Sequence, residues 1–244
     1  MALDLADYHR QTERAVKTFW SSRDKATKKQ AQKGALDRDG RTGVTAGKNM
    51  NGFIPLIEDL VRKNGLKNAD IHQSKTVLTL PGYFRPTKIW DIIVTYQERL
   101  IAAIELKSQV GPSFGNNFNN RTEEALGTAH DFWIAYREGA FGEQTRPFTA
   151  WLILVEDTVG SRKPVSNVEP HFSVFPEFNG ASYLDRYEIL CRRMMQEQLY
   201  TAASLVASDR TKAKSGTYSC LSDMTHIKSL VAAFAGHIAA EAAK

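Results

Sequence analysis

Apolar positions in the first quarter of the chain follow helical spacing. They recur through residues 3–33, which predicts a helix whose second half loses the apolar stripe and becomes basic. Residues 34–52 contain five glycines and are predicted to form a loop. The stretch FIPLIEDLVRKNG then predicts a short amphipathic helix over 53–65 that ends at Gly65.

Four segments have the pattern of β-strands. Residues 71–80 are predicted to form one strand, which a Pro-Gly pair closes. Residues 89–96 and 100–108 are two apolar runs separated at 97–99 by a natural hairpin length. The continuous apolar run at 148–157 is typical of a strand that is covered on both faces.

Loops and helices account for most of the second half. The stretch GPSFGNNFNN at 111–120 is rich in Asn and Gly and predicts a loop, and residues 121–139 predict a helix. A Pro-rich linker leads to a predicted long helix at about 181–208, and residues 223–244 predict a final helix.

These elements together predict an α/β fold with a central mixed β-sheet flanked by helices. A chain of 244 residues is long for one average domain and short for two, so we expect a single domain over 1–244. Its core is expected at about 50–157, with a helical N-terminal arm at 1–49 and a helical C-terminal part at 180–244.

Composition narrows the class of protein only slightly. Hydrophobic residues make up 42% and charged residues 24% of the chain, as in ordinary globular proteins. The net charge of +5 is compatible with a polyanionic partner but does not indicate one. The two cysteines form no CxxC pair, which argues against a zinc ribbon. Reduced thiols, and the lack of a signal-like or membrane-spanning segment, lead us to expect a cytoplasmic protein.

Candidate chemistry lies on the predicted hairpin WDIIVTYQERLIAAIELKSQ. Side chains alternate along a strand, so Glu105 and Lys107 share one face. With a turn at 97–99, Asp91 falls roughly opposite Glu105 on the neighbouring strand. Local geometry is therefore expected to bring two carboxylates and one ammonium group together.

Such a group can hydrolyse a phosphodiester. Carboxylates of Asp91 and Glu105, completed by water and a phosphate oxygen, make a site of hard oxygen ligands suited to Mg²⁺. Lys107 could position or deprotonate the attacking water, or stabilise the transition state. The alternative is an ordinary surface ion pair on a strand, because a short D…ExK pattern occurs often by chance.

The motifs IWDIIV and IELKSQ resemble the core of the PD-(D/E)xK nucleases. In addition, FRPTKIWD, IELKSQVGPSFGNNFNNRTEEALG and FWIAYREG resemble the XhoI family of type II restriction endonucleases, through the hairpin and the helix after it. The sequence departs from the superfamily pattern at Trp90, which precedes Asp91 where proline is usual; Pro86 lies upstream.

The resemblance implies a bacterial restriction-modification enzyme with a restriction-endonuclease-like fold. It implies a Mg²⁺-dependent homodimer that cuts double-stranded DNA at the palindrome CTCGAG, after the first C, with four-base 5′ overhangs. By the same resemblance, Asp91 and Glu105 correspond to metal ligands and Lys107 to the catalytic lysine.

Two further polar residues are candidates beside this group. Glu58, on the predicted helix 53–65, could lie beside the metal, as helical carboxylates often do in the superfamily; an ordinary polar surface role is equally expected, and Asp59 competes with it. Gln109 continues the face of Glu105 and could bind the attacking water or a phosphate, although a polar residue at a strand exit is as common.

DNA contacts are predicted in two places. The first is the stretch after the hairpin, whose amides suit base edges and whose arginine suits guanine or a phosphate; its members are Asn116, Asn117, Asn119, Asn120 and Arg121. A cluster of Asn-Gly turns is the alternative. The second is the basic stretch that could follow DNA phosphates, comprising Lys25, Lys28, Lys29, Arg41 and Lys48. A solvated helix face is the commoner explanation of such a stretch.

Three functions are therefore compared. The first is a sequence-specific endonuclease, and the second is a structure-selective DNA repair nuclease of the same superfamily. The third is a DNA-binding module with an inactive nuclease core, against which the intact trio argues. A nucleotide cofactor is not expected, because GVTAGKN is one residue short of a phosphate-binding loop and lacks the Ser or Thr after its lysine.

Overall fold

The computed structural model describes residues 2–32, 46–73 and 77–244. Within them, one five-stranded sheet has the strand order β1-β4-β5-β6-β7. The neighbours of β5 make the sheet mixed, because β4 runs antiparallel to it and β6 runs parallel. The strands are β1 (Asp70–His72), β4 (Ile92–Tyr96), β5 (Arg99–Gln109), β6 (Phe148–Glu156) and β7 (Ala202–Ser208).

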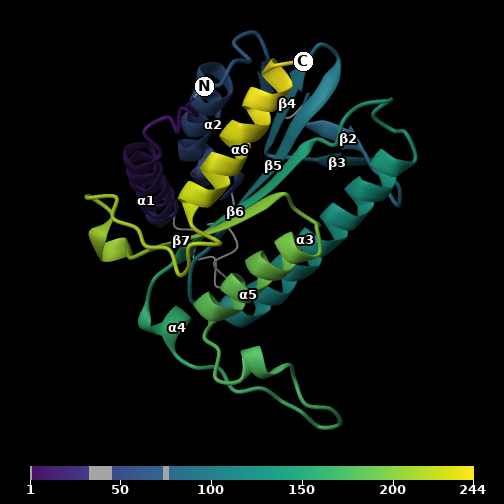
Figure 1. The fold of residues 1–244 in the computed structure, drawn as a ribbon. Helices are drawn as coiled ribbons and strands as arrows, with labels where there is room; N and C mark the ends of the chain where they lie inside the picture. Colours follow the sequence, from purple (N-terminus) through teal and green to yellow (C-terminus); the bar gives the residue numbers. More distant parts are fainter. Residues whose placement is uncertain (1, 33–45, 74–76) are drawn as a thin grey trace.

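Helices cover both faces of this sheet, as Figure 1 shows. One apolar core joins the sheet to α1, α2 and α6, and a second joins the opposite face to α3 and α5. Because side chains alternate along β5, Ile104 and Leu106 enter the first core while Ala103 enters the second. The helices are α1 (Tyr8–Gln32), α2 (Ile54–Lys63), α3 (Phe114–Arg137), α5 (Tyr183–Gln196) and α6 (Ile227–Ala242).

The expected α/β fold with a mixed sheet between helices is confirmed. The helices predicted at 3–33, 53–65 and 223–244 are present as α1, α2 and α6. The strands predicted at 100–108 and 148–157 are present as β5 and β6. The turn between β4 and β5 is a two-residue turn in which Gln97 and Glu98 have positive φ, the conformation that suits a tight hairpin.

The predicted strands at 71–80 and 89–96 are wrong as continuous strands. The first contains parts of β1 and of β2 (Thr79–Pro81), which belong to different sheets. The second is split into β3 (Thr87–Ile89), which pairs with β2 in a small two-stranded sheet, and β4. The backbone crosses between the sheets at Trp90, whose N–H donates to Leu78 O at 2.8 Å. The sequence pattern does not mark this crossing because Trp90 is as apolar as the strand residues around it.

The predicted helix at 181–208 is also wrong in its second half. Helix α5 ends at Gln196, Gln198 has positive φ, and residues 202–208 form β7. Every residue of β7 is buried, because α5 covers one face and α6 the other. A short apolar run buried on both faces carries no periodicity that separates a strand from a helix.

Two predicted loops contain helical structure. Residues 46–53 form a 3₁₀ helix, η2 (Ala46–Phe53), whereas 33–45 lie outside the described residues. The loop predicted at 111–120 is wrong, because α3 begins at Phe114. Phe114 packs against Tyr183 with ring centroids 5.8 Å apart, and Phe118 one turn later packs against Tyr187 at 5.1 Å. Contact with α5 therefore continues the helix through the asparagines.

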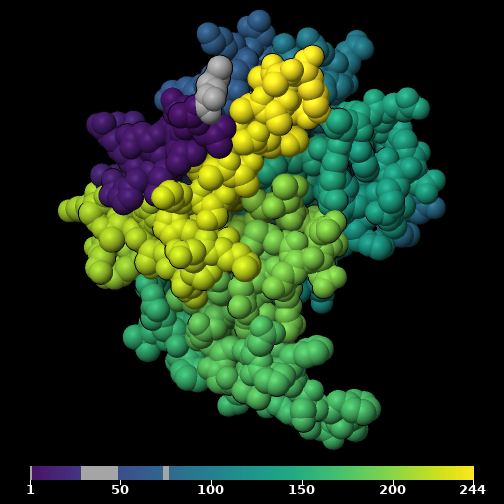
Figure 2. Space-filling model, in the orientation of Figure 1, coloured from purple at the N-terminus to yellow at the C-terminus, as the bar shows by residue number. Residues whose placement is uncertain are grey.

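The remaining segments lie at the surface. Short helical turns occur in α4 (Val159–Arg162), η4 (Pro176–Phe178) and η5 (Arg210–Lys212). Between α4 and α5 the chain extends away from the body of the molecule, and Figure 2 shows this extension at the bottom. In the described part of the chain, the helices are too short or too polar to span a bilayer.

Gly216 fixes the approach of the segment after β7 to α1, and its replacement is expected to destabilise the fold. It has φ +73°, and an added Cβ would overlap the carbonyl oxygen of Glu13. We expect Gly216→Ala to lower the free energy of unfolding by roughly 3 kcal/mol. Gly139→Ala is the matched control, because Gly139 has φ +80° with open space at its Cβ and should cost only about 1 kcal/mol. If urea unfolding gave the same loss of unfolding free energy for both variants, the proposed clash at Gly216 would be contradicted.

Candidate active site

Asp91, Glu105 and Lys107 converge in the structure. Asp91 lies between β3 and β4, and its N–H donates to Ile104 O at 3.2 Å, which continues the β4–β5 ladder by one residue. Its Oδ2 accepts a hydrogen bond of 2.8 Å from the Leu106 N–H. Lys107 Nζ lies 3.7 Å from that same Oδ2 and forms an ion pair with Glu105 Oε2. The hairpin thus places two carboxylates around one ammonium group.

Strand alternation explains why these charges face one side. Glu105 and Lys107 stand opposite Trp151 and Ile153 of β6, which belong to the core beneath α3 and α5. Leu106 between them points into the core on the other face. Two apolar layers therefore hold the strand in place while its charged residues point towards α3.

Lys88 is a member of this group that the sequence analysis did not single out. It lies in β3, and its Nζ binds Glu105 Oε1 at 2.6 Å and lies over the ring of Trp90, 5.6 Å from the centroid. The two oxygens of Glu105 thus each contact a lysine. The only signal in the sequence is that Lys88 and Trp90 are two positions apart, which places them on one strand face.

Burial and charge act in opposite directions on these groups. Burial by itself raises the pKa of Glu105, but Lys107 and Lys88 outweigh it and leave the carboxyl pKa below its ordinary value. Burial by itself lowers the pKa of Lys107, but Glu105 and Asp91 outweigh it and raise the pKa of the ammonium group. The pKa of Asp91 is raised, first by burial and then by the nearby charge of Glu105. Glu105 and Lys107 are therefore held ionised. The ionised form of Asp91, by contrast, is destabilised by burial and by the negative charge of Glu105.

A hollow of about 630 Å³ opens beside this group. Glu105, Lys107 and Lys88 line it on the sheet side, and α3 forms the opposite wall with residues that include Arg121 and Asp131. The floor contains Tyr200, whose hydroxyl donates to Ala125 O at 3.2 Å. The buried carboxylate of Glu105 thus borders open space that charged side chains surround.

The donor set fits a hard divalent cation. Two carboxylates lie close enough for Glu105 to raise the pKa of Asp91, and a cation between them would relieve that repulsion. Asp91 Oδ1 has no hydrogen-bond partner among residues 2–32, 46–73 and 77–244. Those same residues contain no cluster of three His, Cys, Asp or Glu side chains, so water and phosphate oxygens would have to complete the coordination.

Glu58 and Gln109 are not brought into contact with this trio. Glu58 Oε1 accepts a hydrogen bond of 2.5 Å from Gln73, just beyond the end of β1. Gln109 is buried, and its Oε1 accepts a hydrogen bond of 3.4 Å from the Tyr187 hydroxyl of α5. Their suggested roles beside the metal and the attacking water remain predictions.

The asparagines lie on α3 and not on a loop. Asn116, Asn119 and Asn120 are exposed, whereas Asn117 is half-buried. Helical spacing places 116, 119 and 120 on neighbouring parts of one surface in the first two turns. Arg121 lines the hollow and pairs with Glu124 at 2.6 Å. The structure therefore presents amides at the start of the same helix that forms one wall of the hollow.

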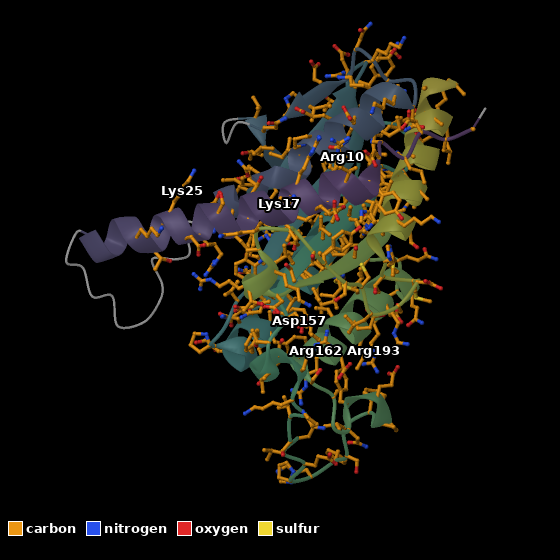
Figure 3. All side chains as sticks on the ribbon, turned by 90° about the vertical axis from the view of Figure 1, so that its left-hand side faces the viewer. Arg10, Lys17, Lys25, Asp157, Arg162 and Arg193 are labelled. Carbon is orange, nitrogen blue, oxygen red and sulfur yellow. The ribbon has the colours of Figure 1, made fainter. Side chains whose placement is uncertain are left out.

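The described part of the basic N-terminal stretch is in the opposite layer from Asp91, Glu105 and Lys107. Lys25 and Lys28 are exposed on α1, which packs on the sheet face that Leu106 enters, and Figure 3 shows Lys25 near the far end of this helix. The side chains of Lys29 and Lys48, and the whole of Arg41, lie outside the described residues. A contact between these residues and DNA remains a prediction.

The mixed sheet, the charged hairpin and the adjoining hollow define the class of restriction-endonuclease-like nucleases. Residues 29–220 match the family described as restriction endonuclease XhoI. The type II restriction enzyme XhoI of Xanthomonas vasicola is 54% identical over 196 residues, which cover 80% of this chain and 78% of that enzyme. The chain belongs to the XhoI restriction endonuclease family.

Two more relatives have the same kind of name. The type II restriction enzyme AbrI of Azospirillum brasilense is 58% identical over 172 residues, which cover 70% of this chain and 77% of that enzyme. The type II restriction enzyme BstVI of Geobacillus stearothermophilus is 45% identical over 217 residues, or 87% of this chain and 96% of that enzyme. No solved structure matches the chain. The protein is a type II restriction enzyme, a site-specific deoxyribonuclease that acts on DNA.

Proposed function

We propose that this restriction endonuclease hydrolyses double-stranded DNA in a Mg²⁺-dependent reaction that Asp91, Glu105 and Lys107 carry out. The observation that carries the proposal is the ion-paired group at the hollow, where Lys107 lies 3.7 Å from Asp91 Oδ2 and contacts Glu105. The proposed target is the palindrome CTCGAG, cut after the first C to leave four-base 5′ overhangs. The similarity to the XhoI enzyme supports this target.

Asp91 and Glu105 would hold the Mg²⁺, with Leu106 N–H fixing the orientation of the Asp91 carboxylate. When bound, the ion polarises the phosphate and helps to neutralise the charge on the leaving oxygen. The carboxylates favour the charged form of Lys107, so its Nζ is a cationic donor that can hold the attacking water or bind the phosphate. Lys88 keeps Glu105 ionised through its contact with Oε1.

A palindromic target suits a two-fold assembly. Each subunit of a homodimer would cut one strand, so that protein symmetry mirrors the symmetry of the site. We further propose that the enzyme works without a nucleotide cofactor in the bacterial cytoplasm, as part of a restriction-modification system. The membership of the XhoI family supports these assignments.

A plasmid digest tests the function directly. The purified full chain and Mg²⁺ are expected to convert a plasmid into discrete fragments whose sequenced ends all begin within CTCGAG. EDTA should abolish the cutting, and a plasmid with one base pair of each site changed should remain intact. Binding without cutting would indicate an inactive nuclease core. Cutting only at flaps or junctions would indicate a structure-selective repair nuclease.

A further inference from the structure

The loop at 82–86, between β2 and β3, borders the hollow beside Glu105 and Lys107. Phe84 and Arg85 of this loop line the hollow. The side chain of Phe84 is 66% exposed, although it is large and apolar. An exposed aromatic ring at the mouth of a charged hollow is typical of a surface that binds a ligand.

A buried carboxylate on α3 holds this loop. Asp131 is only 4% exposed, and its Oδ1 accepts hydrogen bonds of 2.8 Å from the N–H groups of both Tyr83 and Phe84. Its Oδ2 accepts a hydrogen bond of 2.8 Å from Arg85 Nε. These bonds lower the pKa of Asp131 although burial opposes them, so the carboxylate stays charged at neutral pH.

The loop approaches Asp131 so closely that only glycine fits at its start. A Cβ on Gly82 would lie 2.6 Å from Asp131 Oδ2 and 2.7 Å from Arg85 O. The Phe84 ring also stacks on His130 of α3, with ring centroids 5.8 Å apart and planes 9° apart. The exposed ring is therefore fixed in one orientation before any ligand arrives, which reduces the entropy cost of binding.

Arg85 keeps donors available for a ligand. Its Nε is bound to Asp131, but its two Nη groups have no acceptor in the described part of the chain. A guanidinium group oriented at one edge presents the other edge as a fork that matches phosphate oxygens. The side chain is 43% exposed, so a phosphate can reach it without displacing the bond to Asp131.

We propose that Phe84 and Arg85 form a preassembled contact with duplex DNA beside the phosphate that is cut. Arg85 binds a neighbouring backbone phosphate through Nη, and Phe84 packs against the deoxyribose and base edge next to it. Asp131 is a positioning residue that orients Arg85 and the loop. This inference rests on the proposed function, because Glu105 and Lys107, beside which the phosphate that is cut would lie, line the same hollow as Phe84 and Arg85.

Equilibrium binding to a cognate duplex, with Ca²⁺ in place of Mg²⁺ to prevent cutting, tests the contact. Phe84→Ala and Arg85→Gln should each weaken binding about tenfold. Arg85→Gln should also reduce the slope of log affinity against log salt by about 1, as loss of one phosphate contact requires, whereas Phe84→Ala should leave that slope unchanged. If Arg85 had a purely structural role, Arg85→Gln would leave the salt slope unchanged.

Asp131→Asn tests the positioning role. The Asn carbonyl oxygen can still accept from the loop amides, but its amide nitrogen cannot accept from Arg85 Nε. We expect the variant to raise KM about tenfold at unchanged kcat, and to reduce the salt slope as Arg85→Gln does. Thermal unfolding shows whether each variant retains the fold.

Two controls separate the contact from general effects. Phe172→Ala removes another exposed phenylalanine, which lies between α4 and α5 and does not line the hollow. Arg162→Gln removes another exposed arginine that an aspartate holds, Asp157, and Figure 3 labels this pair on the face of the molecule away from β2 and β3. Both variants should bind DNA as the wild type does.

The inference is overturned if folded Phe84→Ala and Arg85→Gln bind and cut DNA like the wild type, or if Phe172→Ala weakens binding as much as Phe84→Ala. It is also overturned if Phe84→Ala changes the sedimentation of the free protein, which would make the loop a contact between subunits. Each of these results leaves the proposed function intact. By contrast, a wild-type enzyme that cuts no DNA overturns the proposed function itself.

Discussion

Lys107→Ala is expected to reduce the rate of DNA cutting about 1,000-fold while leaving DNA affinity within a few-fold of the wild type. Lys107 supplies the positive charge between Asp91 and Glu105, at 3.7 Å from Asp91 Oδ2. Truncation removes the donor that we propose holds the attacking water or stabilises the transition state. The rest of the DNA-binding surface is unchanged. Single-turnover cutting of a duplex measures the rate, and binding in Ca²⁺ measures the affinity.

Lys63→Ala is the matched control for this variant. Lys63 also pairs with a carboxylate, Asp59, at 3.0 Å, but it lies on the surface of α2 in the other layer. Its truncation should leave the cutting rate unchanged, because an exposed ion pair contributes only about 0–1 kcal/mol to stability. Wild-type cutting by a folded Lys107→Ala protein would remove Lys107 from the proposed mechanism.

Asp91→Asn is expected to have two opposite effects. Cutting should fall by about 1,000-fold or more, because the site loses one of the two carboxylates proposed to hold the Mg²⁺. The metal-free protein should nevertheless become more stable at neutral pH, by about 1 kcal/mol, which is about 2–4 °C in Tm for a chain of this size. The physical reason is that burial and Glu105 raise the pKa of Asp91, so its ionisation opposes folding. Asn keeps an oxygen to accept the Leu106 N–H.

The pH dependence of this gain tests its origin. A pKa raised by folding means that the protonated carboxyl is stabilised below the unfolded-state pKa of ~3.9, and that this advantage is lost as pH rises through the folded-state value. The gain of Asp91→Asn in metal-free buffer should therefore be full at neutral pH and disappear in acid. Adding Mg²⁺ should raise the Tm of the wild type more than that of the variant. Asp70→Asn, an exposed aspartate at the start of β1, serves as control and should change neither quantity.

The convergence of the charged side chains on the β4–β5 hairpin could be predicted because its geometry is local. Strand alternation places Glu105 and Lys107 together. The two-residue turn at 97–98 would by itself set Asp91 opposite Ile104, and the register shift between Val94 and Thr95 moves Asp91 opposite Glu105. Lys88 could not be predicted in the same way. It reaches Glu105 only because the chain leaves the main sheet before Trp90 and pairs β3 with β2, which is a tertiary event.

The same distinction explains the errors in the element assignments. Strand β7 is defined by burial between two helices, which a single apolar run does not encode. The first turns of α3 are held by Phe114 and Phe118 against α5, so contacts with a distant segment decide that asparagines form a helix and not a turn. Phe114 and Phe118 at a spacing of four were a local signal for this helix, but the Asn-Gly composition opposed it.

The hairpin residues are held by the sheet, whereas the neighbouring residues on α3 and the loop lie at the surface, where side chains can be exchanged. Asp91, Glu105 and Lys107 take their spacing from the hydrogen-bond ladder of the sheet, which two apolar cores clamp from opposite sides. The groups proposed to contact the duplex stand instead on the surface of α3 and on a short connecting loop. On this proposal, a change of target sequence needs only different side chains on a helix, and the hydrogen-bond ladder that spaces Asp91, Glu105 and Lys107 stays the same. The residues proposed to recognise the target sequence can therefore change while the residues proposed to hydrolyse DNA stay the same.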